Sequence, residues 1–491
     1  MQLIRLLDAL PQKTVIGRSD KIVGNIVHDS RLVTPGDIFV ALREPTGRDG
    51  HKYIHEAIAQ GASVVVKEAG GFVKDTTSVV VVPDTSRALG YMAAAYFGNP
   101  ANEMSVIGIT GTNGKTTVSL LIEAILQECG YSVGGLGTLG SRFEGKVLDP
   151  TLNHTTPYPM ELHRTIRKIR ERGGAFIVME VSSHSLVWER LTELNFNTCV
   201  FTNLSRDHLD THKTFEAYRE AKMLLFSDYL QKDGQAVLNL CDPAFPYFKK
   251  ASPSKVCSFG LEKKADVHTV GPVKFSKNRT TFTAQVKDNN PFPLFLNLLG
   301  RFNVYNALAA ISVGLEYGAD YNIIQRAISK VKVPGRLEQV EGGQPFNVLV
   351  DFAHTPDALA AVLIACQEWT SGKLIVVFGC GGDRDSGKRP LMGHAASSNA
   401  DVVIVTSDNP RTEPPDQIIK DIEPGLLPNT QTQIIQDRSE AILEALNQAQ
   451  KDDTVLIAGR GEESYQIVGH SHIEFDDRIK TLEYLEAKYG K

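Results

Sequence analysis

From residue 105 onward, short apolar runs alternate along the chain with segments that have a helical spacing of apolar positions. Such short, uninterrupted runs are typical of strands that are buried on both faces of a sheet. The runs lie at 105–110, 175–181, 198–204, 234–240, 347–351, 373–379, 401–407 and 453–459. The clearest helical pattern, at 116–129, follows the first run after a glycine-rich turn. The alternation predicts an α/β fold with parallel sheets.

Two breaks divide this pattern into three parts. The first is the Asn-Pro-rich stretch FGNPANEMS, which is typical of a linker, and the second lies near KVKVPGRLEQV. A chain of 491 residues also suggests about three domains of ordinary size. We therefore predict a small N-terminal α/β domain, a central domain with a P-loop-type parallel sheet, and a Rossmann-like C-terminal domain. Their expected bounds are 1–98, 99–333 and 334–491.

Composition narrows the class of protein. Hydrophobic residues make up 42% of the chain and charged residues 22%, as in ordinary globular proteins. The net charge of -5 offers no basic surface for nucleic acid, and no apolar run approaches the roughly 20 residues of a membrane span. The six cysteines have no paired spacing and predict reduced thiols. We expect a cytoplasmic protein that binds neither nucleic acid nor the membrane interior.

The glycine-rich turn GITGTNGKTT, at 108–117, is the strongest functional motif. It ends like a phosphate-binding loop, but Ile109 stands where the usual pattern has its first glycine. Backbone N–H groups of such a turn point at one spot, and the helix dipole adds positive potential there. Lys115 would reach the outer phosphates of a nucleotide, and the Thr116 hydroxyl would suit magnesium. The alternative is a tight turn with a solvated lysine.

Three polar residues downstream of this turn follow or interrupt apolar segments. Glu180 ends one apolar run, and His208 follows the next one. A carboxylate and an imidazole beside phosphate oxygens suit magnesium, although each alone is more often an ordinary polar residue. Lys222 falls on a helical stripe of apolar residues at 215, 218, 225 and 226. That pattern alone favours a lysine that extends its amine to solvent.

The pattern TGTNGKTT and the order of these residues resemble the Mur ligase family, which also includes the folylpolyglutamate synthases. The resemblance implies that ATP is the co-substrate, that Thr116 and Glu180 bind one magnesium ion, and that His208 binds a second. It also implies that carbon dioxide converts Lys222 into N6-carboxylysine, another ligand of the second ion. The implied catalytic residues are Lys115, His208 and Lys222. The implied ATP contacts are Gly111, Thr112, Asn113, Gly114, Lys115, Thr116, Thr117, Asn303, Arg336, Asp351 and His354.

Within this family, the chain resembles over essentially its whole length the ligases that add the third amino acid of a UDP-muramoyl peptide. The stretch HDSRLVTPGDIFVALREPTGRDGH is similar to their uridine-nucleotide domain, and TLNHTTP and EVSSHSLVWER are similar to their dipeptide-binding segments. The Ser and Thr residues in these stretches also suit turns and helix caps. The implied contacts to the UDP-N-acetylmuramoyl dipeptide are Ser30, Thr155, Thr156, Ser182 and Arg190.

The segment SDNPRTEPP indicates which amino acid is added. It resembles the pattern of relatives that add meso-2,6-diaminopimelate, whereas lysine-adding relatives usually lack its arginine. The chemistry agrees, because diaminopimelate has a distal carboxylate that lysine lacks, and a guanidinium binds a carboxylate through two hydrogen bonds. Taken alone, the segment also suits a turn after a strand. The implied diaminopimelate contacts are Arg384, Asp408, Asn409, Pro410, Arg411, Gly459 and Glu463.

The resemblance implies a monomeric amide ligase of peptidoglycan precursor synthesis that activates a glutamyl carboxylate as an acyl phosphate. A ligase for another amino acid, such as L-lysine, or for another UDP-peptide is the first alternative. Departures from the family pattern keep it open: Arg460 and Glu462 replace a lysine and a histidine, and Ser185 and Trp188 alter the dipeptide segment. Residues 1–98 argue against a folylpolyglutamate synthase. The retained ATP and metal residues argue against a nucleotide switch without turnover.

Overall fold

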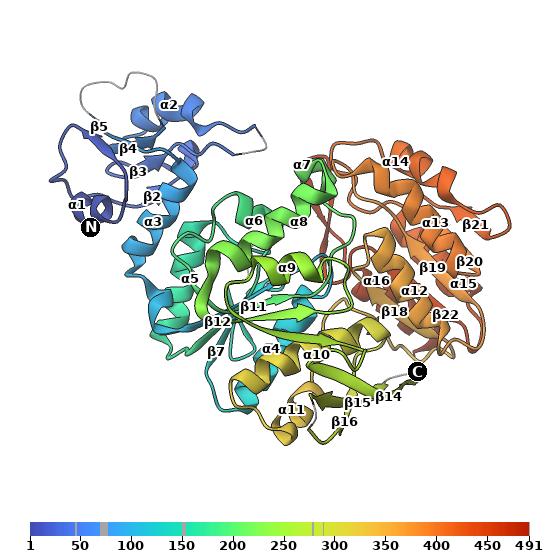
Figure 1. The fold of residues 1–491 in the computed structure, drawn as a ribbon. Helices are drawn as coiled ribbons and strands as arrows, with labels where there is room; N and C mark the ends of the chain where they lie inside the picture. Colours follow the sequence, from blue (N-terminus) through green and yellow to red (C-terminus); the bar gives the residue numbers. More distant parts are fainter. Residues whose placement is uncertain (45–46, 69–76, 150–153, 277–278, 288, 491) are drawn as a thin grey trace.

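The computed structural model describes residues 1–44, 47–68, 77–149, 154–276, 279–287 and 289–490 (Figure 1). Three sheets of five, eleven and six strands follow one another along this part of the chain, and a small hairpin follows the third. Parts of two stretches that resemble substrate-binding segments, 45–46 and 151–153, lie outside the described residues. No helix within the described ranges is long and apolar enough to cross a bilayer.

The first sheet belongs to the N-terminal domain, at the upper left of Figure 1. Its strand order is β1-β5-β4-β3-β2, in which β1 is antiparallel to β5 and the other neighbours are parallel. Helix α3 ends at Phe97, because Gly98 adopts a left-handed φ of 78°. The elements are α1 (Leu3–Asp8), β1 (Thr14–Ile16), β2 (Ile26–Val27), β3 (Ile38–Val40), α2 (Ile54–Ala59), β4 (Val64–Lys67), β5 (Ser78–Val81) and α3 (Thr85–Phe97).

The central sheet has the order β16-β15-β14-β13-β12-β11-β6-β10-β7-β8-β9. Its middle, from β14 to β7, is parallel, and antiparallel strands extend it at both edges. The strands are β6 (Ser105–Thr110), β7 (Val133–Gly137), β8 (Gly140–Phe143), β9 (Lys146–Asp149), β10 (Phe176–Glu180), β11 (Phe196–Phe201), β12 (Leu230–Asn239), β13 (Lys255–Gly260), β14 (Val267–Ser276), β15 (Arg279–Val286) and β16 (Phe292–Leu296).

Helices cover both faces of the central sheet because its strands are apolar on both sides. On one face, Ile107 and Ile109 of β6 pack in a cluster with α4 and α10; on the other, Val106 packs in a cluster with α5 and the end of α8. The helices are α4 (Lys115–Glu128), α5 (Pro159–Glu171), α6 (Ser183–Val187), α7 (Leu209–His212), α8 (Phe215–Leu224), α9 (Phe245–Ala251), α10 (Arg301–Glu316) and α11 (Tyr321–Ile328).

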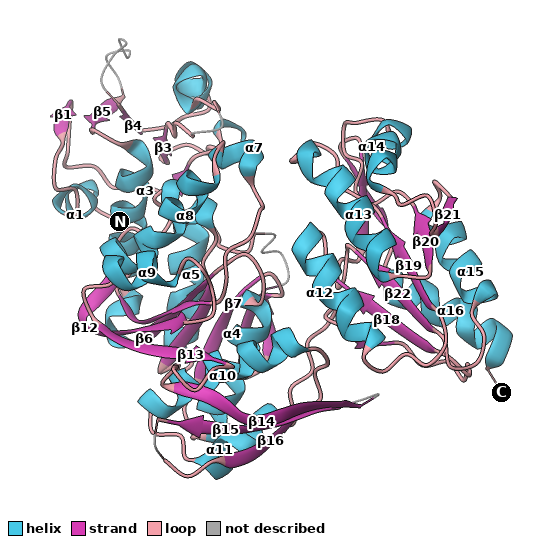
Figure 2. Cartoon of the chain, turned by 45° about the vertical axis from the view of Figure 1, so that its right-hand side comes forward, coloured by secondary structure: helices cyan, strands magenta, loops and turns pink. Residues whose placement is uncertain are grey.

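The C-terminal sheet, of order β17-β18-β22-β19-β20-β21, is parallel except for β17. Figure 2 shows α12 and α13 on one of its faces and α15 and α16 on the other. Alternate strand residues point to opposite faces of the sheet. Val376 packs with α12 and α13 on one face, and Val377 packs with α15 on the other. The elements are β17 (Glu338–Gln339), β18 (Asn347–Asp351), α12 (Pro356–Gln367), β19 (Leu374–Phe378), α13 (Arg389–Asn399), β20 (Val402–Val405), α14 (Pro415–Ile422), β21 (Gln431–Ile434), α15 (Arg438–Gln448), β22 (Thr454–Ala458), β23 (Tyr465–Val468), β24 (Ser471–Glu474) and α16 (Asp477–Tyr489).

The predicted α/β fold is confirmed, and every apolar run named above contains a strand of one of the two large sheets. The helix after the glycine-rich turn begins at Lys115, one residue before the expected start. The antiparallel extension formed by β14, β15 and β16 was not predicted. Its strands alternate buried and exposed positions, so they lack the continuous apolar runs on which the prediction relied.

Candidate active site

The glycine-rich turn connects β6 to α4 and is fixed by the end of β11. Gly111 and Gly114 have φ values of 150° and 88°. A Cβ atom on Gly111 would collide with the Thr202 hydroxyl, and one on Gly114 would collide with the Asn306 side-chain oxygen. Asn203 accepts hydrogen bonds from the backbone N–H groups of the two residues between these glycines. The motif therefore requires glycine at both positions, for space as well as for backbone conformation.

The amino end of α4 has the properties of an anion-binding site. Gly114 caps the helix without a side-chain hydrogen bond to its first turn. The residues from Thr112 to Thr117 line the cavity described below, so the first-turn N–H groups face it. Unsatisfied N–H groups and the positive end of the helix dipole favour phosphate at such a position.

Two lysines meet behind this turn. Lys115 Nζ donates to the backbone oxygens of Gly111, at 2.9 Å, and Thr112, at 3.0 Å. Lys222 Nζ donates to the same Gly111 oxygen at 2.9 Å. Burial, followed by the charge of Lys115, holds the pKa of Lys222 well below its ordinary value. Burial also lowers the pKa of Lys115, whereas Glu180 favours its charged form. A neutral amine is therefore accessible at Lys222.

Helix α8 buries Lys222 instead of directing it to solvent. The residue is only 1% exposed, as is Tyr218 one turn earlier. The expectation of a lysine that extends its amine to solvent is therefore wrong. The apolar stripe on which it rested is also incomplete, because Phe215 is exposed. The side chain points inward, where its amine donates to the Gly111 oxygen.

Three oxygen and nitrogen donors suited to magnesium line the same cavity. Glu180 accepts hydrogen bonds from the Thr138 N–H at 2.9 Å and the Thr138 hydroxyl at 3.1 Å, which fixes its carboxylate. Thr116 and His208 also line the cavity. Among the described residues, no group of three or more His, Cys, Asp and Glu side chains forms a metal site. This donor set fits magnesium, whose remaining ligands in such sites are phosphate oxygens and waters.

Asp207 and His208 form a tightly coupled pair at this edge. The Asp207 carboxylate lies 3.3 Å from His208 Nε2 and 3.9 Å from Nε2 of His354, which belongs to the C-terminal domain. Burial opposes the charged form of Asp207, but the charge of Lys388 and the hydrogen bond from the His208 backbone N–H hold its pKa below the ordinary range. Burial lowers the pKa of His208 well below its ordinary value, so its imidazole can serve as a neutral ligand.

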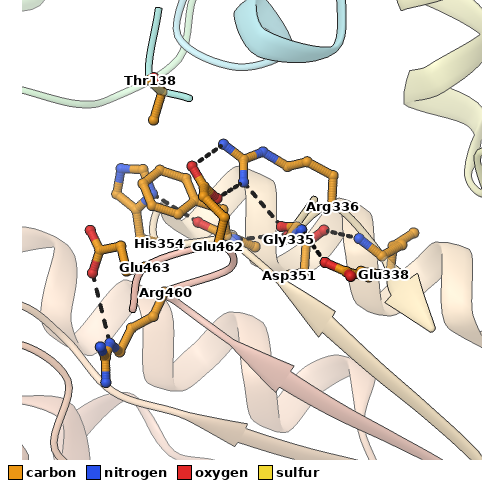
Figure 3. Close-up of polar contacts among 12 residues, drawn as sticks. Thr138, Gly335, Arg336, Glu338, Asp351, His354, Arg460, Glu462 and Glu463 are labelled. Atoms are coloured by element: carbon orange, nitrogen blue, oxygen red, sulfur yellow. Dashed lines mark hydrogen bonds and ion pairs between the residues drawn. The ribbon is translucent and has the colours of Figure 1, made fainter. Parts of the chain in front are cut away.

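The C-terminal domain contributes a second group of charged residues at the ends of β18 and β22 (Figure 3). The Asp351 carboxylate accepts hydrogen bonds from the N–H groups of Leu337, at 2.7 Å, and Ala353, at 2.8 Å, and burial raises its pKa to about 6. The Arg336 guanidinium donates to the Gly335 oxygen at 3.0 Å. It also forms a close ion pair with Glu462.

The segment after β20 forms the far end of the cavity. Arg411 has a left-handed φ of 52°, and its Nη1 donates to the Gly382 oxygen at 2.9 Å. Its backbone pairs with strand β23 through the Ile467 oxygen, at 3.1 Å, and the Gly469 N–H, at 2.7 Å. Burial and the charge of Arg384 lower the pKa of Arg411. Arg384 and Arg411 both line the cavity, and a guanidinium can bind a carboxylate through two hydrogen bonds.

Glu463 lies opposite these arginines. Its carboxylate accepts a hydrogen bond from Asn409 Nδ2 at 2.8 Å. Burial and the charge of Asp408 raise its pKa to about 7. Gly459 is needed beside them because a Cβ atom there would lie 2.6 Å from the Asp408 carboxylate. Arg460 points away from the cavity: it is fully buried and donates to the oxygens of Tyr465 and Phe475, which supports the hairpin of β23 and β24.

One cavity of about 1090 Å³ joins all these groups between the central and C-terminal domains. It lies at the carboxyl ends of the strands of both sheets, where ligands bind in open α/β folds. Across its mouth, Arg206 pairs with Asp385 at 3.2 Å and links the two domains. The expected site residues that line it are Thr112, Asn113, Gly114, Lys115, Thr116, Thr117, Thr155, Glu180, His208, Arg336, Asp351, His354, Arg384, Asp408, Asn409, Arg411, Gly459 and Glu463.

Several expected contacts lie behind or away from the cavity wall. Asn303 is buried, and its side chain bonds the Leu299 oxygen at 2.7 Å and Asn306 at 2.9 Å; Asn306 is the one that lines the cavity. Lys222, Gly111 and Pro410 lie just behind lining residues. Four further residues on the cavity wall, Asn306, Thr138, Asp207 and Lys388, were not predicted from the sequence. Among these four, only Asp207 could have been suggested by the sequence, because it directly precedes His208.

The expected dipeptide contacts form a connected group at the end of β10. The Thr156 hydroxyl donates to the backbone oxygen of Glu180 at 2.9 Å and accepts a hydrogen bond from the backbone N–H of Ser182 at 3.1 Å. Arg190 donates to the Thr156 oxygen at 2.9 Å, and its guanidinium lies 3.8 Å from the Tyr158 ring centre and 4.8 Å from that of Trp188. The remaining expected contact, Ser30, is buried in the N-terminal domain.

Known proteins share this architecture and these segments. A model of the Mur ligase middle domain matches residues 109–314, and one of the Mur ligase glutamate ligase domain matches residues 335–461. This chain belongs to the Mur ligase family. The two matched segments of this Mur ligase contribute the two walls of the cavity.

Several full-length relatives of this Mur ligase carry the name UDP-N-acetylmuramoyl-L-alanyl-D-glutamate–2,6-diaminopimelate ligase. The protein of this name from Syntrophomonas wolfei subsp. wolfei is 41% identical over 99% of this chain and 100% of its own length. That from Geobacillus thermodenitrificans is also 41% identical, over 97% of this chain and 98% of its own length. A solved structure of a ligase of the same name is 34% identical, with a TM-score of 0.68, over 98% of this chain and 99% of the solved one.

Proposed function

We propose that this Mur ligase uses ATP to join meso-2,6-diaminopimelate to UDP-N-acetylmuramoyl-L-alanyl-D-glutamate, a step of peptidoglycan precursor synthesis in the cytoplasm. The observation that carries the proposal is that one cavity is lined by the phosphate-type turn at Lys115 and by Arg384 and Arg411. A ligase needs this arrangement, because a nucleotide and an acceptor must reach the same carboxylate. The full-length relatives named for this reaction support the same assignment.

The reaction begins at the amino end of α4. The glutamyl carboxylate attacks the γ-phosphorus of ATP, and ADP leaves, so that an acyl phosphate forms. Lys115 and the first-turn N–H groups stabilise the negative charge on the transferring group. The amine of diaminopimelate then attacks the acyl carbon, loses a proton, and phosphate leaves. Arg206 and Asp385 form an ion pair between the two domains, and closure of the domains would keep water from the acyl phosphate.

We assign one magnesium ion to Thr116 and Glu180 and a second to His208, all on the wall of the cavity where the phosphates would lie. When bound, magnesium supplies positive charge beside the transferring phosphoryl group. Thr138 fixes the orientation of Glu180, and Asp207 fixes that of His208. The ATP contacts on the opposite wall are assigned to Arg336, Asp351 and His354, as the family resemblance implies.

Lys222 is assigned as a carbamate formed with carbon dioxide. Two features support this: its amine is buried, and it shares an acceptor with a second cation, Lys115. A neutral amine reacts with carbon dioxide, and the product converts a repulsive neighbour of Lys115 into an attractive one. The group would then carry negative charge toward the second metal site at His208.

Specificity for diaminopimelate is assigned to the far end of the cavity. Arg411 and Arg384 would hold the distal carboxylate of the acceptor, and Glu463 would hold its ammonium group. L-lysine or another UDP-peptide remains the second candidate, because Trp188 lies beside Arg190 in the expected dipeptide segment. The chain is expected to act as a monomer, since both walls of the cavity come from one chain.

Phosphate release is the experiment that tests the function. The enzyme is incubated with ATP and magnesium, with and without the UDP-dipeptide, and with a panel that includes diaminopimelate and L-lysine. We expect release only when both the UDP-dipeptide and diaminopimelate are present. Equal phosphate release in the absence of both substrates would indicate a nucleotide switch. If L-lysine were the only amino acid that supported phosphate release, the enzyme would be a lysine-adding ligase.

A further inference from the structure

Glu462 holds the guanidinium that faces the nucleotide end of the cavity. One carboxylate oxygen of Glu462 contacts Arg336 Nη1, and the other lies 3.5 Å from Nη2 (Figure 3). The two side chains are only 11% and 16% exposed. A pair so poorly solvated attracts more strongly than an ion pair on the surface.

The rest of the Arg336 guanidinium is available to a ligand. Nη1 uses its second hydrogen on the Gly335 oxygen, at 3.0 Å, and the group lies 4.4 Å from the Phe352 ring centre. Among the described residues, Nε has no acceptor, and Figure 3 shows the head group on the side of the cavity toward Thr138. The charge of Arg336 also lowers the pKa of Lys115, so it lies within electrostatic reach of the phosphate-type turn.

The two turns that carry this pair approach each other closely. Gly335 has a φ of 64°, and a Cβ atom on it would collide with the backbone of Gly461 and Glu462. The two backbones are therefore in contact, and rotation of the Glu462 side chain is enough to open the ion pair. Any anion that binds Arg336 from the cavity meets the Glu462 carboxylate at the same guanidinium.

We propose that Glu462 is a positioning residue that competes with the phosphate groups of the nucleotide for Arg336. The proposal rests on the ATP site proposed above. Without nucleotide, Glu462 neutralises the guanidinium and holds it against Gly335. With nucleotide, phosphate oxygens take over the guanidinium and Glu462 turns away. Glu462 therefore weakens nucleotide binding and acts only through Arg336.

The test is titration of the full-length chain with magnesium and a non-hydrolysable ATP analogue, by calorimetry. Glu462→Gln should lower the Kd about three- to tenfold, since removal of one competing carboxylate changes a partly buried charge pair by about this much. Arg336→Ala should raise the Kd. Glu462→Gln in the Arg336→Ala background should leave the Kd of the single Arg336 variant unchanged, because the competitor's target is gone.

Other outcomes overturn the proposal. An unchanged or higher Kd for Glu462→Gln would mean that Glu462 supports the site. If Glu462→Gln lowered the Kd equally in the Arg336→Ala background, Glu462 would repel the phosphate groups directly and not through Arg336. Absence of nucleotide binding by the unaltered chain would instead refute the proposed ATP site.

Glu338→Gln is the matched control. Glu338 lies on the same turn, and its carboxylate accepts the Gly335 N–H at 2.6 Å and lies 3.5 Å from Arg478. The change removes the same charge without touching the Arg336 guanidinium. We expect the Kd of Glu338→Gln to be unchanged. A fall in Kd equal to that of Glu462→Gln would overturn the proposal.

Discussion

Lys115 and Lys222 donate hydrogen bonds to one carbonyl oxygen, that of Gly111, and both distances are 2.9 Å. Lys222 lies 111 residues after that glycine. Two ammonium groups on a shared acceptor repel each other, and burial at Lys222 adds to the penalty. The arrangement therefore favours loss of the Lys222 proton and lets the amine be modified.

Replacement of Lys222 tests its assigned role in catalysis. Lys222→Ala should lower kcat at least about 100-fold, as loss of a group that acts only in the transition state would do. High bicarbonate, or a small carboxylic acid that fills the vacated space, should restore part of the activity. Lys250→Ala, on the exposed end of α9, is the control and should behave like the unaltered enzyme. Normal turnover by Lys222→Ala would show that the lysine is only structural.

Buried Lys222 should also lower the stability of the folded protein. Because burial lowers its pKa, the folded protein holds the Lys222 proton less tightly than the unfolded chain does. This loss of stability is present at pH 7 and disappears as the pH rises through the unfolded-state value of about 10.4. In carbon dioxide-free buffer at pH 7, Lys222→Met should therefore raise the Tm by about 2–4 °C. A lower Tm would mean that the hydrogen bond to Gly111 outweighs the cost of burial.

Arg411 should determine which amino acid is used. Arg411→Ala should raise the KM for diaminopimelate and lower kcat/KM about 100-fold, because a charge-assisted pair in a desolvated pocket is lost. The KM for ATP should change little, and discrimination against L-lysine should shrink. Arg384→Ala should act in the same direction. Arg326→Ala, an exposed arginine of α11 paired with Glu128, is the control.

Two results together would contradict the assigned role of Arg411. If the unaltered enzyme used lysine as well as diaminopimelate, and Arg411→Ala affected neither, the segment at Asp408–Arg411 would be only a turn. Steady-state kinetics with both amino acids separate the two cases.

Glu463 should give acceptor binding a pH dependence. Its pKa is raised to about 7, so its carboxylate is neutral below that pH and charged above it. Only the charged form pairs with the ammonium group of the acceptor, so kcat/KM for diaminopimelate should rise as the pH increases through 7. Glu463→Gln should lower kcat/KM and remove this step. A step that persists in Glu463→Gln would belong to another group, such as the acceptor amine.

Local sequence patterns specified the buried parallel strands after residue 105, the glycine-rich turn and the polar residues at the strand ends. Apolar runs such as 347–351 specify buried strands wherever they are placed, and Gly111 and Gly114 are demanded by local backbone conformation. The family resemblance then supplied an expected role for each of these residues. The strands β15 and β16 escaped prediction because their alternating burial is a weaker local signal than an uninterrupted apolar run.

The pairing of charged side chains depends on the three-dimensional packing of the chain. The helical pattern favoured a solvated amine at Lys222, but the fold closes α8 over Gly111 and leaves that amine buried. Arg460 and Glu462 are two positions apart in the sequence, yet one braces a hairpin and the other pairs with Arg336 of a distant turn. Such partners come from segments that sheet packing brings together, and no local pattern records them, because burial and charge pairing depend on neighbours that are remote in sequence.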